Sequence, residues 1–271
     1  MEDTDTNLHN FIVQLRRHYP QVYDIAQLLS DDYTHSLQQV DTRKGNLEIE
    51  ASFGTNLYNS LGKKYFNHNL PQGIIREIIE VLGSFGGWSS VSDWFLVYDY
   101  DLGNRKRVRV SYENQTQNVS CITKESLVCR DVGYDEINPQ TWALRNFITR
   151  INTKFEVDDT YTENQLLEFK SVRVSMRKYF TIPSNNLSYI SWSIELIQCW
   201  YGKTLAEAEL NMTQKPPECS FECEIMNLPT TDKLSRIQKL LIFSSLLLKI
   251  QDLFDIPNTL HSLNLPSFKL L

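Results

Sequence analysis

Short runs in which apolar and charged residues alternate are the main pattern along this chain. Alternation with a period of two predicts β-strands that have one apolar face and one charged face. In LEIEASF, which starts at Leu47, the glutamates point to one side and the apolar residues to the other. Six runs show this alternation, at residues 47–53, 105–113, 147–156, 171–180, 189–197 and 220–226. The sequence therefore predicts a mainly β architecture.

Three stretches have the spacing of helices instead. Residues 6–30 present one apolar face, although Pro20 should break or kink the helix. Residues 72–83 form a second helix, which the glycines that follow should end. The third, 231–254, begins at a Thr-Asp pair suited to an N-cap and ends before Pro257. Its apolar character favours packing under the sheet as a pedestal over docking of a partner.

The charged faces of the strands change sign along the chain. One interpretation is an antiparallel sandwich with a solvated outer face. The other is a closed barrel whose polar interior holds a metal on one side and an anion on the other. Because a solvated face more often mixes signs, the segregation favours the barrel. Acidic residues come first and last, with basic residues between: Glu48 and Glu50, then Arg107, Arg109, Lys124, Arg150, Lys154, Arg173 and Arg177, then Glu195, Glu222 and Glu224.

The acidic faces have the chemistry of a divalent-metal site. Two glutamates at positions i and i+2 of a strand project from one face, roughly 7 Å apart. A second pair on a neighbouring strand would complete a cluster of hard oxygen ligands, which suits Mg²⁺ or Mn²⁺. Without a cation, four converging carboxylates would repel one another and raise their pKa values. The pairs Glu48–Glu50 and Glu222–Glu224 are therefore the expected two halves of such a site.

The basic faces carry groups that bind phosphate. Arginine offers forked donors that bind phosphate oxygens bidentately, and lysine supplies a point charge. Alternation places the basic residues toward the same lumen as the glutamates. Glu195 or Glu222 is a candidate for positioning a water or for orienting an arginine. Acidic faces that can hold a metal ion, opposite basic faces that can bind phosphate, together predict hydrolysis of a polyphosphate chain.

Composition narrows the function classes. The 271 residues include 27 basic and 33 acidic side chains, with a net charge of −6. This balance argues against a protein that coats long nucleic acids, but not against a basic pocket that grips one phosphorylated end. The five cysteines lack a CxxC pair, so reduced thiols in an intracellular protein are expected and a zinc site is not. No signal-peptide pattern is seen, and the apolar run 240–248 is too short to span a membrane.

Seven motifs in order along the chain resemble those of a known enzyme family. They are LEIEASFG, RVRVSYE, ITK, RINTKFE, VRVSMRK, SIEL and FECEI, and they extend over about residues 45–228. The set resembles the RNA triphosphatases of the triphosphate tunnel superfamily found in fungi, protozoa and viruses. The resemblance implies a mainly β (α+β) fold, a closed antiparallel eight-stranded β-barrel with peripheral helices. Residues 1–40 would be a helical extension, and residues 41–271 the tunnel domain with the C-terminal helix packed on the barrel.

The resemblance also implies roles for individual residues. Glu48, Glu50 and Glu224 correspond to direct metal ligands, with Glu222 beside them. Phosphate-binding positions correspond to Arg109, Lys124, Arg150, Arg173 and Arg177. Combined with the alternation, this predicts three groups: metal ligands Glu48, Glu50 and Glu224; catalytic residues Glu222, Arg109, Arg177 and Glu195; and substrate-binding residues Arg107, Lys124, Arg150, Lys154 and Arg173.

The implied activity is metal-dependent removal of the γ-phosphate from triphosphate-ended RNA before mRNA capping, with hydrolysis of free nucleoside triphosphates as a side activity. No KxDG motif occurs, so the guanylyltransferase would be a separate chain and a partner. The N-terminal helix is a candidate contact for that enzyme or for a second copy in a homodimer. The expected location is the nucleus or, for a viral protein, a replication site in the cytoplasm.

Some positions depart from the family pattern. Ser193, Ile197 and Ser220 replace polar or charged residues found in many relatives, which affects the expected mechanism in detail but leaves the metal set intact. Relatives that act on thiamine triphosphate, polyphosphate or adenylate carry a lysine where this chain has Ser52, so the RNA branch is favoured. The alternatives are a non-RNA tripolyphosphatase and an inactive interaction subunit of the same fold. An inactive site has no reason to keep four mutually repelling glutamates.

Overall fold

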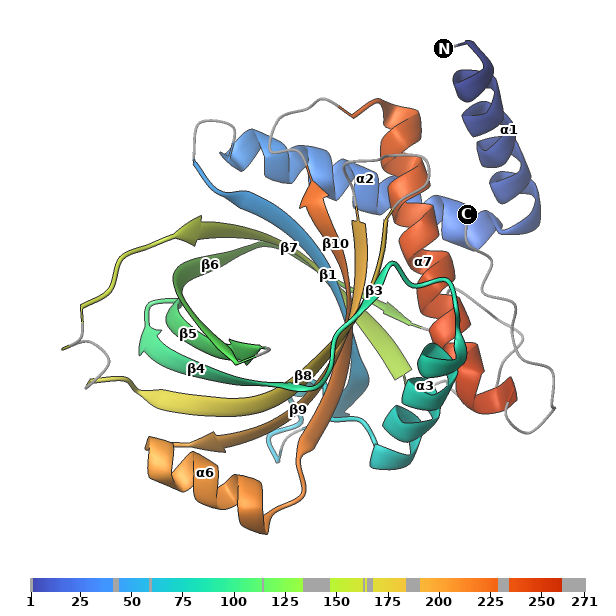
Figure 1. Cartoon of the computed structure of the whole chain (residues 1–271). Coiled ribbons are helices and arrows are strands. Elements are labelled where there is room, and N and C mark those ends of the chain that lie inside the picture. Colours follow the sequence, from blue (N-terminus) through green and yellow to red (C-terminus); the bar gives the residue numbers. More distant parts are fainter. Residues whose placement is uncertain are drawn as a thin grey trace.

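The computed structural model describes residues 2–40, 44–58, 60–113, 115–133, 147–162, 164, 168–183, 191–228 and 234–259. These residues form ten strands and five helices. The strands curl into a barrel, and the longest helices lie together on one side of it (Figure 1).

Eight antiparallel strands form a closed barrel. Their order is β10-β9-β8-β4-β5-β6-β7-β1, and pairing between β1 and β10 completes the ring (Figure 1). The expected eight-stranded barrel is confirmed, and the sandwich is excluded. The barrel strands are β1 (Asn46–Tyr58), β4 (Phe95–Gly103), β5 (Lys106–Glu113), β6 (Thr116–Gly133), β7 (Phe147–Asp158), β8 (Ser171–Pro183), β9 (Ser191–Gly202) and β10 (Glu218–Leu228). Two short strands add to it, β2 (Lys64–Asn67) beside β1 and β3 (Ser90–Val91) beside β8.

Two of these strands were missed or shortened by the sequence patterns. Strand β4 has apolar residues on both faces, with Phe95 and Val97 on one and Tyr98 and Tyr100 on the other. It therefore lacks the apolar–charged alternation that marks its neighbours. Strand β6 is much longer than the ITK motif inside it, because its first part pairs with β5 and its last part pairs with β7.

The hydrophobic core lies outside the barrel, between the β1–β10 wall and a layer of helices. Because successive side chains of a strand point to opposite faces, each glutamate that faces the lumen alternates with a residue that faces this core. Phe53 of β1 and Phe221 of β10 are fully buried there, with their rings stacked 3.9 Å apart. Helix α7 (Arg236–Thr259) supplies Leu246 and Ile250 to the same core. Helix α7 therefore packs against the outer face of β1 and β10.

Both ends of α7 differ from the prediction. Thr231 and Asp232, the expected cap, lie outside the described residues, and the helix begins at Arg236. A capping box precedes it: Ser235 Oγ accepts a hydrogen bond from Gln238 N at 3.2 Å, and Gln238 Oε1 accepts one from Ser235 N at 2.8 Å. The helix continues to Thr259 instead of ending before Pro257. The proline falls in the last turn, where its missing N–H removes a single helical hydrogen bond.

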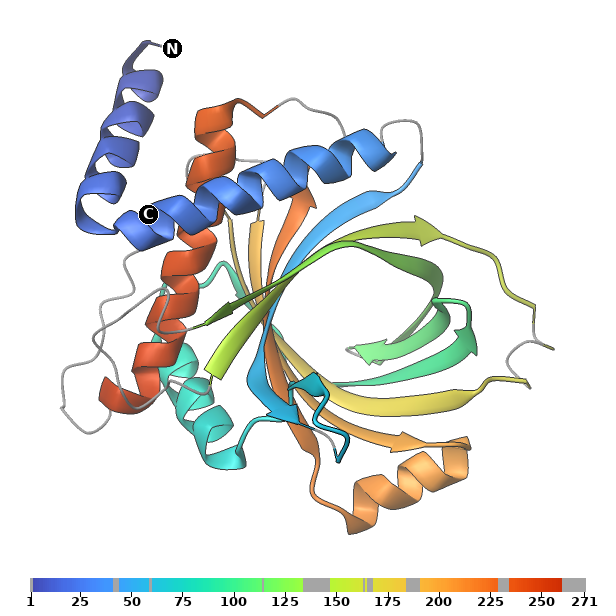
Figure 2. The same cartoon turned by 180° about the vertical axis from the view of Figure 1, so that it is seen from behind.

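The remaining helices surround the same wall. Helices α1 (Glu2–His18) and α2 (Pro20–Val40) replace the single helix predicted at the N-terminus, with the expected break at Pro20. Helix α2 crosses α7, and α3 (Gln72–Ser84) packs on its other side (Figure 2). Helix α6 (Leu205–Gln214) lies apart, against β8 and β9. Within the described chain, none of the helices meets the length and hydropathy needed to cross a membrane.

The helix layer and the barrel share one core. Residues of α2 such as Val22, Leu29 and Tyr33 belong to the same buried cluster as α7 and the outer face of β1. Helix α2 ends at Val40, which coincides with the predicted limit of the N-terminal extension. The division of the chain into an extension and a tunnel domain stays a prediction.

We expect the α7 layer to determine the stability of the barrel wall that carries the glutamates. Replacing Leu246, which is 0% exposed, with Ala should lower the free energy of unfolding by about 2–5 kcal/mol because it leaves a cavity. Leu210→Ala on α6, at a side chain that is 52% exposed, is the matched control and should change it by less than about 0.5 kcal/mol. Urea denaturation followed by tryptophan fluorescence measures both. Equal effects at the two positions would contradict this packing.

Candidate active site

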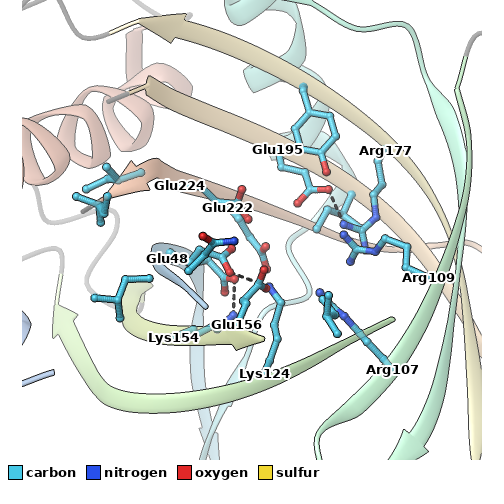
Figure 3. Close-up of a pocket in the computed structure, with 18 of the residues that line it drawn as sticks. Glu48, Arg107, Arg109, Lys124, Lys154, Glu156, Arg177, Glu195, Glu222 and Glu224 are labelled. Carbon is cyan, nitrogen blue, oxygen red and sulfur yellow. Dashed lines mark hydrogen bonds and ion pairs between the residues drawn. The ribbon is translucent and has the colours of Figure 1, made fainter. Parts of the chain in front are cut away.

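A polar cavity of about 410 Å³ lies inside the barrel. All the predicted site residues except Arg150 line it, and side chains from acidic and basic strands face one another across it (Figure 3). Its charged lining is Glu48, Glu50, Glu156, Glu195, Glu222 and Glu224, together with Arg107, Arg109, Lys124, Lys154, Arg173 and Arg177.

Pairing of β1 with β10 brings the two Glu-x-Glu motifs together. In this register Glu50 lies opposite Glu224, and Ser52 lies opposite Glu222. Carboxylate oxygens of Glu48, Glu50 and Glu224 lie within 4.8 Å of one another, and the same holds for Glu195, Glu222 and Glu224. Clusters of this size and oxygen chemistry fit Mg²⁺ or Mn²⁺.

The carboxylates at the centre of this cluster resist ionisation. Burial, followed by repulsion from Glu50 and Glu195, raises the pKa of Glu222 to about 8. Burial and the carboxylates around it also raise the pKa of Glu224 well above its ordinary value. A divalent cation would remove this conflict, because it attracts the charged form of each ligand. The residues present therefore fit a bound metal ion.

Two lysines partly neutralise the outer glutamates. Lys124 Nζ lies 2.8 Å from Glu48 Oε2 and also pairs with Glu156. Burial opposes ionisation of Glu48, but attraction to Lys124 outweighs it and lowers the pKa. Lys154 forms an ion pair with Glu50. Lys154 lies on β7, which pairs directly with β1, and Lys124 lies on β6, the next strand of the barrel, so these ion pairs join neighbouring strands (Figure 3).

Asp99 organises the opposite wall. It accepts hydrogen bonds from Arg109 Nε at 2.7 Å, Arg173 Nη2 at 2.6 Å and Arg177 Nη2 at 2.9 Å. The register explains the first two contacts, because Asp99 of β4 lies between Arg109 of β5 and Arg173 of β8. Burial opposes ionisation, yet the arginines hold the pKa of Asp99 well below its usual range. Sequence reasoning missed this residue; its alternation with Asp101 in FLVYDYDLG was the available signal.

Glu195 orients an arginine. Its Oε1 accepts a hydrogen bond from Arg177 Nη1 at 2.6 Å, and both side chains are buried. The hydroxyl of Tyr179, which also lines the cavity, donates a second hydrogen bond to Glu195. Burial opposes ionisation, but Arg177 and Arg109 lower the pKa of Glu195. Of the two roles considered for Glu195, this geometry supports orientation of Arg177.

Arg107 differs from the other arginines. Its buried Nε has no hydrogen-bond partner within the part of the chain that the structure describes. Burial and repulsion from Arg109 lower its pKa to about 10. An unpaired donor buried beside other cations is costly unless an anion binds there. The Arg107 side of the cavity therefore fits a bound anion.

Arg150 lies outside the cavity. It shares a face with Lys154, but its Nε donates to Asp131 at 2.8 Å and its guanidinium lies 4.4 Å from the ring centroid of Phe66. Alternation assigned the face correctly but not the position along the barrel. Of the three departures from the family pattern, Ile197 lines the cavity, whereas Ser193 and Ser220 are buried without lining it.

The chain has the fold of RNA triphosphatases. It is similar to the RNA triphosphatase Pct1 of S. pombe, with a TM-score of 0.51 and 14% identity over 88% of this chain and 90% of that chain. The same enzyme in complex with the Spt5 CTD has a TM-score of 0.55 and 17% identity, over 88% of this chain and 93% of that chain. The mimivirus capping enzyme triphosphatase has a TM-score of 0.51 and 16% identity, over 83% of this chain and 96% of that chain. No protein-family model and no curated protein matches the sequence.

The raised carboxyl pKa values predict a pH-dependent stability. The folded chain keeps a proton on Glu222 up to a pKa of about 8, whereas an ordinary carboxyl loses it near 4.5. The stability linked to this proton is therefore present below about pH 4.5 and is lost as pH rises through about 8. In EDTA the Tm should fall between pH 5 and 9, and Glu222→Gln should make that fall shallower. Differential scanning fluorimetry measures both.

A divalent metal ion should counteract the loss of stability at high pH. Mn²⁺ should raise the Tm of the wild type, most strongly at pH 8 to 9, because the cation stabilises the ionised carboxylates. Glu48→Gln with Glu224→Gln should reduce this shift. An equal Mn²⁺ shift in the double variant would contradict a metal site at these residues.

Asp99 should be essential for the basic wall. Its side chain is 7% exposed, and Asp99→Asn removes the charge that three arginines share while nearly keeping the shape. Breaking a buried ion pair on one side leaves uncompensated charge, so the free energy of unfolding should fall by about 3–5 kcal/mol. Asp101→Asn, at an exposed position two residues along β4, is the control. Urea denaturation at pH 7 that gave equal stabilities for the two variants would contradict the organising role of Asp99.

Proposed function

We propose that this protein is an RNA 5′-triphosphatase that releases the γ-phosphate from triphosphate-ended RNA. The observation that carries the proposal is the arrangement of one cavity inside the barrel, with Glu48, Glu50 and Glu224 clustered on one side and arginines on the other. The first side fits a hard divalent cation and the second a polyanion. The triphosphate end of an RNA with its bound metal ion matches both sides, because the metal fits the glutamates and the phosphates fit the arginines.

Glu48, Glu50 and Glu224 would hold Mg²⁺ or Mn²⁺, with Glu222 beside them. The ion would supply polarisation of the γ-phosphate and orientation of the attacking water. Glu222, beside these ligands, would position that water and accept a proton from it. Water attacks the γ-phosphorus, the bond from phosphorus to the β–γ bridging oxygen breaks, and the products are inorganic phosphate and a diphosphate-ended RNA.

The basic residues would bind the phosphates and stabilise charge that develops on the γ-oxygens. Arg109, Arg173 and Arg177 are fixed in place by Asp99, so they need little reorganisation during the reaction. Arg107 supplies its unpaired donor. Lys124 and Lys154 pair with the glutamates in this structure and can turn to phosphate oxygens once a cation occupies the cluster.

The biological setting that we propose is mRNA capping. Its support is the fold shared with S. pombe Pct1 and with the mimivirus capping enzyme triphosphatase. The next enzyme, an mRNA guanylyltransferase, would be a separate chain that binds this one, in the nucleus or at a viral replication site in the cytoplasm. The structure of Pct1 with the Spt5 CTD shows that one protein with this fold binds a protein partner. Contact through a second copy is a further proposal for the N-terminal helices.

The decisive assay measures inorganic phosphate released from γ-labelled triphosphate-ended RNA in Mg²⁺ or Mn²⁺. Wild type should release it only with a divalent metal, and Glu48→Gln and Glu224→Gln should lower kcat by about a hundredfold or more, because each removes a metal ligand. Glu113→Gln, a carboxylate at the end of β5 that does not line the cavity, is the control and should retain activity.

The outcomes separate the alternatives. Cleavage of inorganic tripolyphosphate but not of RNA would favour the tripolyphosphatase alternative. A folded protein that hydrolyses neither substrate with any divalent metal would favour the interaction subunit. Activity that survived in both metal-ligand variants would contradict the assigned site.

A further inference from the structure

A second cavity, of about 360 Å³, continues from the first. The two share Arg107, Lys124 and Arg173, so they are neighbouring parts of one lumen. The strand register gives the direction: Arg109, Asp99 and Arg173 pair at one level, and Arg107, Asp101 and Ser171 pair at the next. The second cavity therefore lies beyond the arginine wall, on the side away from the carboxylate cluster. Its lining is Asp99, Asp101, Arg105, Lys106, Arg107, Lys124, Ser171, Arg173 and Tyr201.

This second cavity has an excess of positive charge. Five basic residues line it against two aspartates. Lys106 and Lys124 are paired with carboxylates outside this lining, and Asp99 is bound by three arginines, so Arg105 and Arg107 carry the charge that remains. Arg105 is exposed at the tip of the β4–β5 hairpin, where it and Asn104 have φ values of 65° and 52°. Such a two-residue turn is tight, so the backbone beneath Arg105 is fixed. No ion pair of Arg105 is found within the described residues.

An exposed aromatic ring lies in the same cavity. Tyr201 of β9 is 42% exposed and lies opposite Arg173 of β8 in the strand register. A half-exposed aromatic ring beside cations is the arrangement with which proteins bind single-stranded nucleic acid, by base stacking and phosphate contacts. A bare polyphosphate offers nothing for this ring to stack on.

The opposite part of the lumen has different chemistry. Beside the carboxylate cluster, the first cavity is lined by Leu47, Ile225, Leu228 and Glu156, which are apolar or acidic. A polyanionic RNA chain gains nothing from apolar side chains, and Glu156 adds no positive charge because it is paired with Lys124. Charge therefore distinguishes the two sides of the lumen.

We propose that RNA reaches the active site through the second cavity, with Arg105 contacting the phosphate that follows the triphosphate and Tyr201 stacking on a terminal base. This inference rests on the proposed function and adds the direction of the RNA and two specificity residues. Arg105 and Tyr201 distinguish RNA from inorganic tripolyphosphate, because only RNA extends past Arg107 and Arg173, the arginines that line both cavities.

The test compares KM for a triphosphate-ended oligoribonucleotide with KM for inorganic tripolyphosphate, in Mn²⁺, for full-length variants. Arg105→Ala and Tyr201→Leu should each raise the ratio of the RNA KM to the tripolyphosphate KM by about tenfold. Tyr201→Phe, which keeps the ring, should restore the wild-type ratio. Lys203→Ala removes an exposed charge near Tyr201 but outside both cavities, and should leave the ratio unchanged.

Salt dependence supplies a second readout that a loss of folding would not mimic. If Arg105 contacts an RNA phosphate, Arg105→Ala should reduce the slope of log KM against log salt by about 0.7 for RNA. Asn46→Glu places a charge at the opposite side of the lumen, where Asn46 lines the first cavity. It should raise the RNA KM less than Arg105→Glu does.

Each outcome bears on one proposal or the other. Hydrolysis of RNA with unchanged ratios in the Arg105 and Tyr201 variants, or a larger effect of Asn46→Glu than of Arg105→Glu, would overturn the direction proposed here and leave the triphosphatase function standing. Hydrolysis of tripolyphosphate alone by the wild type would overturn both.

Discussion

Pairing of β1 with β10 is the constraint on which the rest of the structure depends. It joins strands about 170 residues apart in the chain and sets Glu50 opposite Glu224. Without it, the two Glu-x-Glu motifs would lie on separate sheet edges and each would be an ordinary solvated pair. Closure also buries the opposite faces of the same strands against α7, with Phe53 and Phe221 in contact. The apolar outer face therefore stabilises the strands whose inner face carries buried, mutually repelling charge.

The cavity tolerates so much charge because its two walls are balanced in different ways. Asp99 neutralises part of the basic wall from inside that wall, through three arginines on two neighbouring strands. The acidic wall has no such internal counter-ion. It receives Lys124 and Lys154 from β6 and β7, the strands next to β1, while Glu222 and Glu224 are left with raised pKa values. The fixed wall is suited to binding phosphate, and the unsatisfied wall to binding a cation.

The sequence predicted most of the lumen because a period of two is a local property that requires no knowledge of the fold. The charged residues that alternation assigned to the lumen all line the cavity except Arg150, which lies beside Asp131 and Phe66. Periodicity gives the face of a strand and not its height in a tilted barrel. Asp99 was missed for a different reason: the first part of β4 is apolar on both faces, and its only contrast in polarity is the short alternation of Asp99 and Asp101 with apolar and aromatic neighbours.

The ion pairs that Lys124 and Lys154 form with Glu48 and Glu50 connect metal binding to phosphate binding. These two glutamates are among the three proposed metal ligands. A cation that bound there would compete with both ammonium groups and release them beside Arg107, whose buried Nε already lacks a partner. The positive charge facing the phosphates would then rise when the acidic wall is filled. Since coupling between two ligands is reciprocal, a triphosphate that drew the lysines away would in turn strengthen binding of the cation. With the ligands proposed above, the lumen would favour joint binding of metal and triphosphate over binding of either one alone.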